Sequence, residues 1–204
     1  MMISQYREIK SVKYDEERNM LIIEYYRGEG ETASEHEVFL ESPKTVLIRM
    51  VEEVRDLINE GIPRTDTRIT GLVGDIGQDY TRFYLEEDIK EIVSRVTGIP
   101  KEELKVVQGD PNRGPDFYVY HKEGLVAIVE VKTTITSVRY PKGSLDEGRG
   151  QLKDYFTEEK WKYLREAKFG IPIAIYLKDL DKIIETEFKE GVEHTTGDIV
   201  WNPN

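Results

Sequence analysis

Hydrophobic positions in the first 61 residues follow two different periods. Short runs at 9–15, 20–26 and 36–40 alternate between apolar and polar residues and are separated by polar, turn-forming segments. This alternation is typical of antiparallel strands. The apolar positions of the segment 44–61 recur instead at helical spacing, ahead of a glycine and a proline that end the pattern. We therefore expect a three-stranded meander with one helix packed on it.

A change in composition follows this helix. The segment 62–77 contains four glycines or prolines, and 67–73 resembles a short strand. We place a domain boundary here, with an N-terminal subdomain at 1–65 and a larger domain at 66–204.

The larger domain alternates helical and strand patterns, which predicts an α/β fold with helices on both sides of a sheet. The run LVAIVEV at 125–131 is apolar on both faces, as in a central buried strand. Ser144 and Glu147 match a capping box, although Gly148 and Gly150 favour a helix start nearer Gly150. The expected order is helix 79–97, strands 103–108, 115–121 and 125–133, helix 145–168, and strand 172–178.

Two of these strands form a predicted hairpin that carries acidic residues. A three-residue loop at 122–124, with Gly124 in the left-handed conformation, places Asp116 directly opposite Glu130. Lys132 lies two residues beyond Glu130 and therefore shares its face. A two-residue loop would shift the register by one and put the two acids on opposite faces.

Two carboxylates and an ammonium group are costly to bury unless a charged partner compensates them. Mg²⁺ is such a partner, because it takes one or two carboxylates and completes its shell with water and phosphate oxygens. That arrangement suits phosphodiester hydrolysis, with a lysine positioning water or stabilising the transition state. A structural alternative remains for Asp116, because an aspartate after Gly114 and Pro115 commonly begins a turn.

Pro115-Asp116 followed by Glu130-Val131-Lys132 resembles the signature of the PD-(D/E)XK nuclease superfamily. The resemblance implies a restriction-endonuclease-like αβββαβ core and hydrolysis of DNA by Mg²⁺ or Mn²⁺. It implies that Asp116 and Glu130 bind the metal, that the Val131 carbonyl completes the protein's share of the shell, and that Lys132 assists the attacking water.

Two further elements extend this resemblance over about residues 79–178. The family often adds an acid from its first helix, and Glu86 lies at the edge of the apolar stripe there, which makes it a candidate metal ligand. Gln151 and Tyr155, four residues apart, resemble the QxxxY element of the RecB-like branch. In that branch the pair lies near the active site and bound DNA. All three could instead be ordinary surface or packing residues.

Charge qualifies the expectation of DNA binding. The net charge of −11 argues against a protein that coats nucleic acid electrostatically. Residues 132–170 nevertheless hold nine basic and six acidic side chains, and nine minus six leaves this segment at +3. Its candidate DNA contacts are Arg139, Lys142, Arg149 and Lys153.

The chain has no cysteine, which excludes disulfides and the iron–sulfur subtype of the RecB-like branch. It shows neither a signal peptide nor a run of about 20 apolar residues. We expect a cytoplasmic protein with no membrane partner, and the 34% of charged residues, rich in Lys and Glu, favours a thermophilic source.

Two other functions stay open beside the nuclease. One is a nucleic-acid-binding or assembly protein that keeps the fold without catalysis. The other is a Holliday-junction resolvase, which requires a two-fold homodimer. The sequence assigns no role to residues 1–65.

Overall fold

The computed structural model describes residues 9–15, 20–25, 34–39, 42–110 and 114–203. The chain divides into two compact units, Met1–Val46 and Leu47–Asn204. The division therefore lies earlier than the boundary expected near residue 65.

The first unit contains a three-stranded antiparallel sheet in the order β1-β2-β3. Its strands are β1 (Ile9–Asp15), β2 (Met20–Tyr25) and β3 (Ser34–Phe39). The meander expected from alternating hydrophobicity is thus present. The last residues of two expected strands, Tyr26 and Leu40, lie outside the described residues.

Helix α1 (Pro43–Asn59) was expected to pack on this meander, and its buried face lies elsewhere. Leu47, Val51 and Val54 are fully buried, in the hydrophobic cluster that also contains Ile69 and Ile183 of the second unit. The helix therefore contributes to the core of the second unit, which moves the domain division to its N-terminal turn.

A second helical run follows, comprising α2 (Thr67–Tyr80), a π-helical segment (Thr81–Leu85) and α3 (Glu86–Thr97). The strand expected at 67–73 is wrong, because this segment is helical. Asp66 caps α2 by accepting a hydrogen bond from the Arg68 backbone N–H at 3.0 Å. The buried residues of α2 recur at helical spacing and outweigh the low helix propensity of its three glycines; they include Ile69, Val73 and Ile76.

The second unit is built on a six-stranded mixed sheet in the order β4-β5-β6-β7-β8, with β9 pairing β7. Strands β6 and β7 are parallel, and the other pairings are antiparallel. The strands are β4 (Leu104–Gln108), β5 (Phe117–His121), β6 (Gly124–Thr134), β7 (Phe169–Leu177), β8 (Val192–Thr196) and β9 (Val200–Trp201). The last two strands and helix α5 (Leu180–Thr186) were not predicted.

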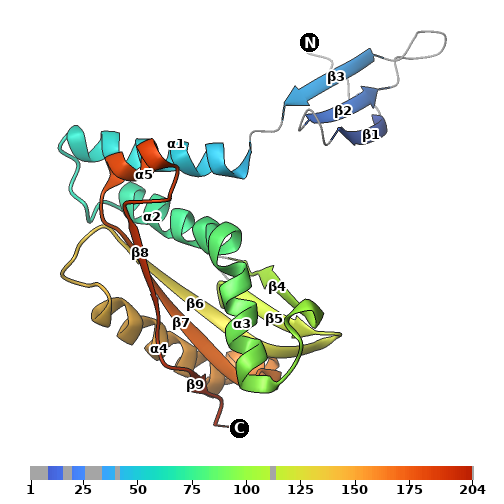
Figure 1. Cartoon of the computed structure of the whole chain (residues 1–204), viewed down its shortest axis with the longest axis vertical. Coiled ribbons are helices and arrows are strands. Elements are labelled where there is room, and N and C mark those ends of the chain that lie inside the picture. Colours follow the sequence, from blue (N-terminus) through green and yellow to red (C-terminus); the bar gives the residue numbers. More distant parts are fainter. Residues whose placement is uncertain (1–8, 16–19, 26–33, 40–41, 111–113, 204) are drawn as a thin grey trace, which may run out of the picture. The chain divides into compact units, whose positions relative to one another are not determined.

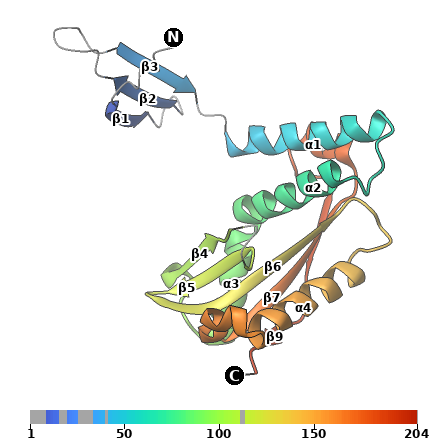
Figure 2. The same ribbon diagram turned by 180° about the vertical axis from the view of Figure 1, so that it is seen from behind.

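Helices cover both faces of this sheet (Figures 1 and 2), as the α/β pattern predicted. Helices α2 and α3 lie on one face, and α4 (Lys142–Thr157) lies on the other with a 3₁₀ segment at Glu159–Glu166. Helix α4 begins before the expected Gly150, and its N-cap is Pro141 rather than Ser144.

Alternate residues of β6 face these two layers. Val129 and Val131 belong to the cluster that contains α2 and α3, whereas Ile128 packs with Leu152 and Phe156 of α4. Beyond the start of β6, from Ile128 to Lys132, the even-numbered residues therefore point towards α4. Among the described residues, no helix is both long enough and apolar enough to cross a bilayer.

Candidate active site

The hairpin between β5 and β6 has a tighter turn than the sequence suggested. His121 pairs with Gly124, so the loop contains only two residues, and Lys122 adopts the left-handed conformation with φ of 56°. The expectation that Gly124 takes this conformation within a three-residue loop is therefore wrong.

A β-bulge restores the register that the shorter loop would have lost. Tyr120 pairs with Leu125, but Val119 pairs with Ala127, so Val126 is an extra residue in β6. Beyond the bulge Phe117 pairs with Val129, and the next step along β5 brings residue 116 level with residue 130. The predicted position of the acids is correct, but the bulge and not the loop produces it.

Asp116 lies at the start of β5, with 9% of its surface exposed. Its Oδ2 accepts a hydrogen bond from the Val131 backbone N–H at 2.7 Å, and its Oδ1 accepts one from Gln78 Nε2 at 2.6 Å. Burial raises the pKa of this carboxyl, and the two hydrogen bonds and the nearby Lys132 oppose the rise.

Glu130 is almost fully buried, with 2% of its surface exposed. Its Oε1 lies 2.9 Å from the Lys132 ammonium, and its Oε2 is buried without a hydrogen-bond partner among the described residues. Burial raises its pKa to about 7, the charge of Asp116 adds to the rise, and Lys132 opposes it. A buried acid with an unsatisfied oxygen is a position that a cation would stabilise.

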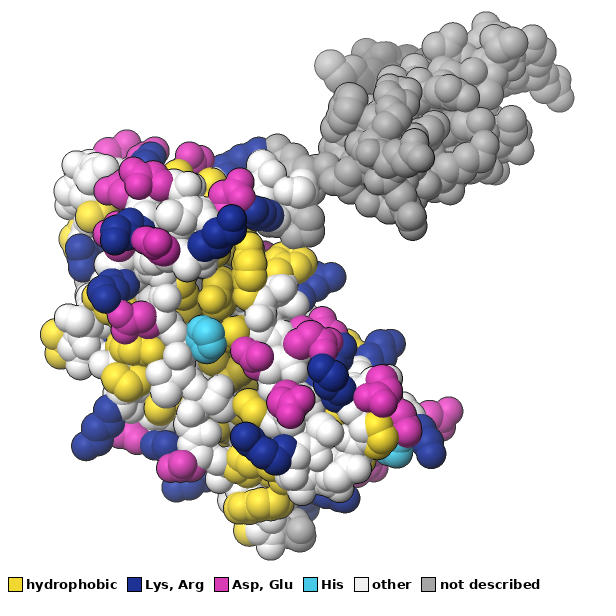
Figure 3. Space-filling model, viewed as in Figure 1, with side chains coloured by type: hydrophobic (Ala, Val, Ile, Leu, Met, Phe, Trp, Pro, Cys, Tyr) yellow, Lys and Arg dark blue, Asp and Glu magenta, His cyan; other side chains and the backbone are white. Residues whose placement is uncertain are grey.

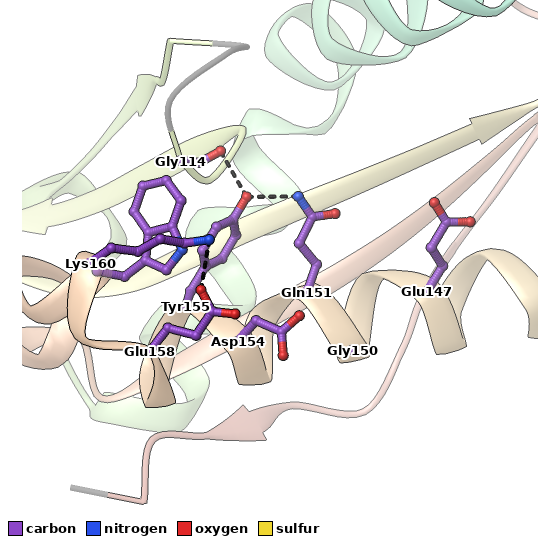
Figure 4. Close-up of a pocket in the computed structure, with 9 residues that line it drawn as sticks. Gly114, Glu147, Gly150, Gln151, Asp154, Tyr155, Glu158 and Lys160 are labelled. Carbon is purple, nitrogen blue, oxygen red and sulfur yellow. Dashed lines mark hydrogen bonds and ion pairs between the residues drawn. The ribbon is translucent and has the colours of Figure 1, made fainter.

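Lys132 is held in place by a chain of hydrogen bonds from α4. Its Nζ donates to Gln151 Oε1 at 2.6 Å, and Gln151 Nε2 donates to the Tyr155 hydroxyl at 2.8 Å. The Tyr155 hydroxyl donates in turn to the Gly114 carbonyl at 2.9 Å (Figure 4). This series of hydrogen bonds connects Lys132 to the segment that precedes Asp116.

The contacts of Asp116 and Lys132 depend on the close approach of helices α2 and α4 to strand β6. Gly148 of α4 lies over the pair, so that an added Cβ would be 3.9 Å from Glu130 Cγ and 3.7 Å from Lys132 Cγ. On the opposite face, an added Cβ at Gly77 would overlap the Thr133 hydroxyl. Only glycine therefore lets α2 approach β6 here, which positions the adjacent Gln78.

A cleft of about 550 Å³ opens beside the hydrogen-bonded chain (Figure 4). Gly114, Gln151 and Tyr155 line it, and Trp161 meets the Tyr155 ring edge-on at a centroid distance of 5.2 Å. The charged residues that line the cleft are Glu147, Asp154, Glu158 and Lys160. Asp116, Glu130 and Lys132 are not among the lining residues, and three of the four charged side chains that line the cleft are acidic.

Glu86 is not brought to this site. It forms an ion pair with Lys90 at 2.7 Å, and the described residues contain no group of three or more acidic or histidine side chains arranged for a metal. Helix α2 contributes Gln78 instead. Sequence reasoning missed this residue because it treated 62–77 as irregular; once α2 is recognised, Gln78 stands out as a polar residue beside a buried glycine.

The four predicted DNA contacts separate into two regions. Arg149 pairs with Asp146 at 3.0 Å and Asp198 at 3.3 Å, and with Lys153 it lines a cavity apart from the cleft. Arg139 lies before α4, and Lys142 is exposed at its first residue. On the face shown in Figure 3, acidic and basic side chains are interspersed rather than gathered by sign.

The residues present fit a divalent cation of the magnesium type. Asp116 and Glu130 supply two carboxylates, which matches the small protein share that Mg²⁺ takes. The Val131 N–H points to Asp116. Because the N–H and C=O of one extended residue point to the same side of the strand, the Val131 carbonyl is directed to the side of β6 on which Asp116 lies.

Comparison with protein-family models, curated proteins and solved structures finds no match for this chain. The fold and the site define it as a mixed α/β protein with a buried acid–lysine site.

Proposed function

We propose that the protein is a metal-dependent nuclease that hydrolyses DNA phosphodiester bonds with Mg²⁺ or Mn²⁺. The observation that carries this proposal is the buried Glu130, whose Oε2 has no hydrogen-bond partner among the described residues, at the level of Asp116 and beside Lys132. The bound cation would activate water and neutralise charge on the phosphate oxygens.

The chain's own residues would prepare the site in complementary ways. The Val131 N–H and Gln78 hold the Asp116 carboxylate in one orientation, so that it need not reorganise when it binds a cation. Glu130 and Gln151 hold the Lys132 ammonium, which would position the attacking water or stabilise charge in the transition state.

The order of elements also supports the resemblance to the PD-(D/E)XK superfamily. Helix α3, strands β4, β5 and β6, helix α4 and strand β7 follow one another as the αβββαβ core requires. The hydrogen-bonded Gln151 and Tyr155 support the RecB-like branch within this proposal, because they link Lys132 to the cleft.

Cleavage assays on linear duplex, single-stranded, flapped and four-way DNA, with Mg²⁺, Mn²⁺ or EDTA, test the proposal. Asp116→Asn, Glu130→Gln and Lys132→Met should each lower the cleavage rate by on the order of 100-fold or more. Glu123→Gln, in the exposed turn of the same hairpin, is the matched control and should cleave normally. Undiminished cleavage in a folded Asp116 or Lys132 variant would reject the assignment.

A non-catalytic nucleic-acid-binding or assembly protein is the second candidate. The acidic lining of the cleft by Glu147, Asp154 and Glu158 favours the assembly protein over the nucleic-acid-binding one, because these side chains repel a phosphate backbone. DNA binding without cleavage in either metal would support the nucleic-acid-binding form of this candidate. Selective cutting of four-way DNA by a two-fold dimer would instead support junction resolution.

A further inference from the structure

A second pocket, of about 290 Å³, lies where β6 ends and is distinct from the acidic cleft. Two arginines, Arg64 and Arg139, line it together with five threonines and two aliphatic residues, and no carboxylate is among the lining residues. This composition is unusual in a chain with a net charge of −11. We name it the arginine–threonine pocket.

We propose that the arginine–threonine pocket binds a backbone phosphate of the nucleic-acid strand, a short distance from the bond that is cleaved. The inference rests on the proposed nuclease function and assigns a substrate-binding subsite to it. Guanidinium groups and hydroxyls are donors that recognise phosphate oxygens without reading sequence.

Arg64 is placed to bind an anion. Its Nη1 donates to the Ile135 carbonyl at 3.2 Å, which fixes the guanidinium at the pocket. Among the described residues, no carboxylate lies within 4.0 Å of this side chain. A guanidinium that donates to one backbone carbonyl has donors left for a phosphate, and threonine residues line the same pocket.

Arg139 adds the second charge. Its side chain is 71% exposed, and its contact with Glu147 is long at 3.9 Å. An exposed pair at this distance stabilises the protein little, so a phosphate can compete for the guanidinium at small cost. Arg149 and Lys153 are weaker candidates, because Arg149 is held by two aspartates and neither residue lines the arginine–threonine pocket.

The pocket adjoins the proposed active site along β6. Thr133 and Thr134 follow Lys132 directly, and Thr134 lies about 7 Å beyond it at 3.3 Å per residue. Glu147 lines the acidic cleft and lies 3.9 Å from both Lys132 Nζ and Arg139 Nη1. Glu147 therefore lies between Lys132 and Arg139 at the end of β6, whereas Thr133 of the pocket faces α2, on the side of the sheet opposite Lys132.

Binding of fluorescein-labelled 20-nucleotide single-stranded and duplex DNA to the full chain, measured by anisotropy in EDTA over a range of salt, tests the proposal. Arg64→Gln and Arg139→Gln should each weaken binding by roughly three- to tenfold and lower the salt-dependence slope by about 1. Arg64→Lys should keep part of the affinity. Arg95→Gln, in the last turn of α3 and outside the pocket lining, is the control and should bind as wild type does.

The possible outcomes distinguish a failure of the pocket assignment from a failure of the proposed nuclease function. A folded Arg64→Gln/Arg139→Gln double variant that binds DNA with the affinity and salt slope of Arg95→Gln overturns the pocket assignment, while metal-dependent cleavage by the wild type leaves the proposed function standing. Calorimetry with inorganic phosphate adds a second arm: arginine-dependent phosphate binding with unchanged DNA binding also overturns it, in favour of a small free anion. A wild-type chain that neither binds nor cleaves these DNAs contradicts the proposed function itself.

Discussion

Replacing Glu130 by glutamine should make the protein's stability less dependent on pH. The substitution keeps the shape of a side chain that is 2% exposed and removes its ionisation. In the folded protein the pKa of Glu130 is about 7, above its ordinary value of 4.5. The folded state therefore holds this proton more tightly than the unfolded state does.

The direction of the pH dependence follows from this difference between the pKa of Glu130 in the folded and unfolded states. The favourable contribution of protonated Glu130 is fully present below pH 4.5 and is lost as the pH rises through 7. The shift of 7 − 4.5, or 2.5 pKa units, corresponds to about 3 kcal/mol at 1.36 kcal/mol per unit. Above pH 7, ionised Glu130 should lower the free energy of unfolding by this amount in the absence of metal.

Urea unfolding followed by tryptophan fluorescence, in EDTA between pH 5 and 8, measures this effect. The free energy of unfolding of wild type should fall relative to that of Glu130→Gln by about 2–3 kcal/mol over this range. Contributions from other carboxylates, including the raised pKa of Asp116, are common to both proteins to first order. Parallel pH profiles for the two proteins would refute the reasoning, because they would mean that Glu130 ionises without cost in the folded state.

Three further predictions test the surroundings of the site. Gly77→Ala should lower the free energy of unfolding by about 1–3 kcal/mol, because its Cβ would meet Thr133, whereas Gly74→Ala, with open space, should raise it by up to about 1 kcal/mol; urea unfolding in which both variants behave alike contradicts this packing. Tyr155→Phe removes the hydrogen bond to Gly114 and should cost about 1 kcal/mol and slow cleavage, so normal stability and rate would count against the chain of hydrogen bonds. Mn²⁺ at 100 times its Kd at pH 8 should stabilise the protein by about 2.7 kcal/mol at that pH, and the same concentration should stabilise it less at pH 5.5 because both acids must be ionised; a thermal shift independent of pH or resistant to EDTA would argue against the metal site.

At the hairpin, the sequence predicts the correct residues but the wrong turn. The residue types Asp116, Glu130 and Lys132 are visible in the chain, and a period of two puts the last two on one face. The position of Asp116 opposite Glu130, however, depends on a bulge at Val126, and no residue type in the sequence indicates that bulge. Because the run 125–131 is apolar on both faces, one extra residue leaves no mark on its pattern, so the correct register was reached through the wrong loop.

Helix α2 shows the opposite difficulty. Its three glycines suggested a boundary, because local propensity disfavours glycine in helices. Gly77 is required by a contact with Thr133, more than 50 residues away in sequence, and such a contact leaves no local signal. For this reason Gln78 was missed and Glu86, which pairs with Lys90, was chosen in its place.

The amino-acid sequence alone determined the elements with strong periodicity and the types of charged residue on them: the N-terminal meander, the central strand β6 and its acid–lysine pair. Local periodicity fixes these because each residue's preference depends on its near neighbours. Tertiary structure decided which groups meet, namely Gln78 with Asp116, Gln151 with Lys132, and Arg64 with Arg139 around one pocket. These contacts depend on how closely the helices approach the sheet, and the packing of segments distant in sequence sets the distance between helix and sheet.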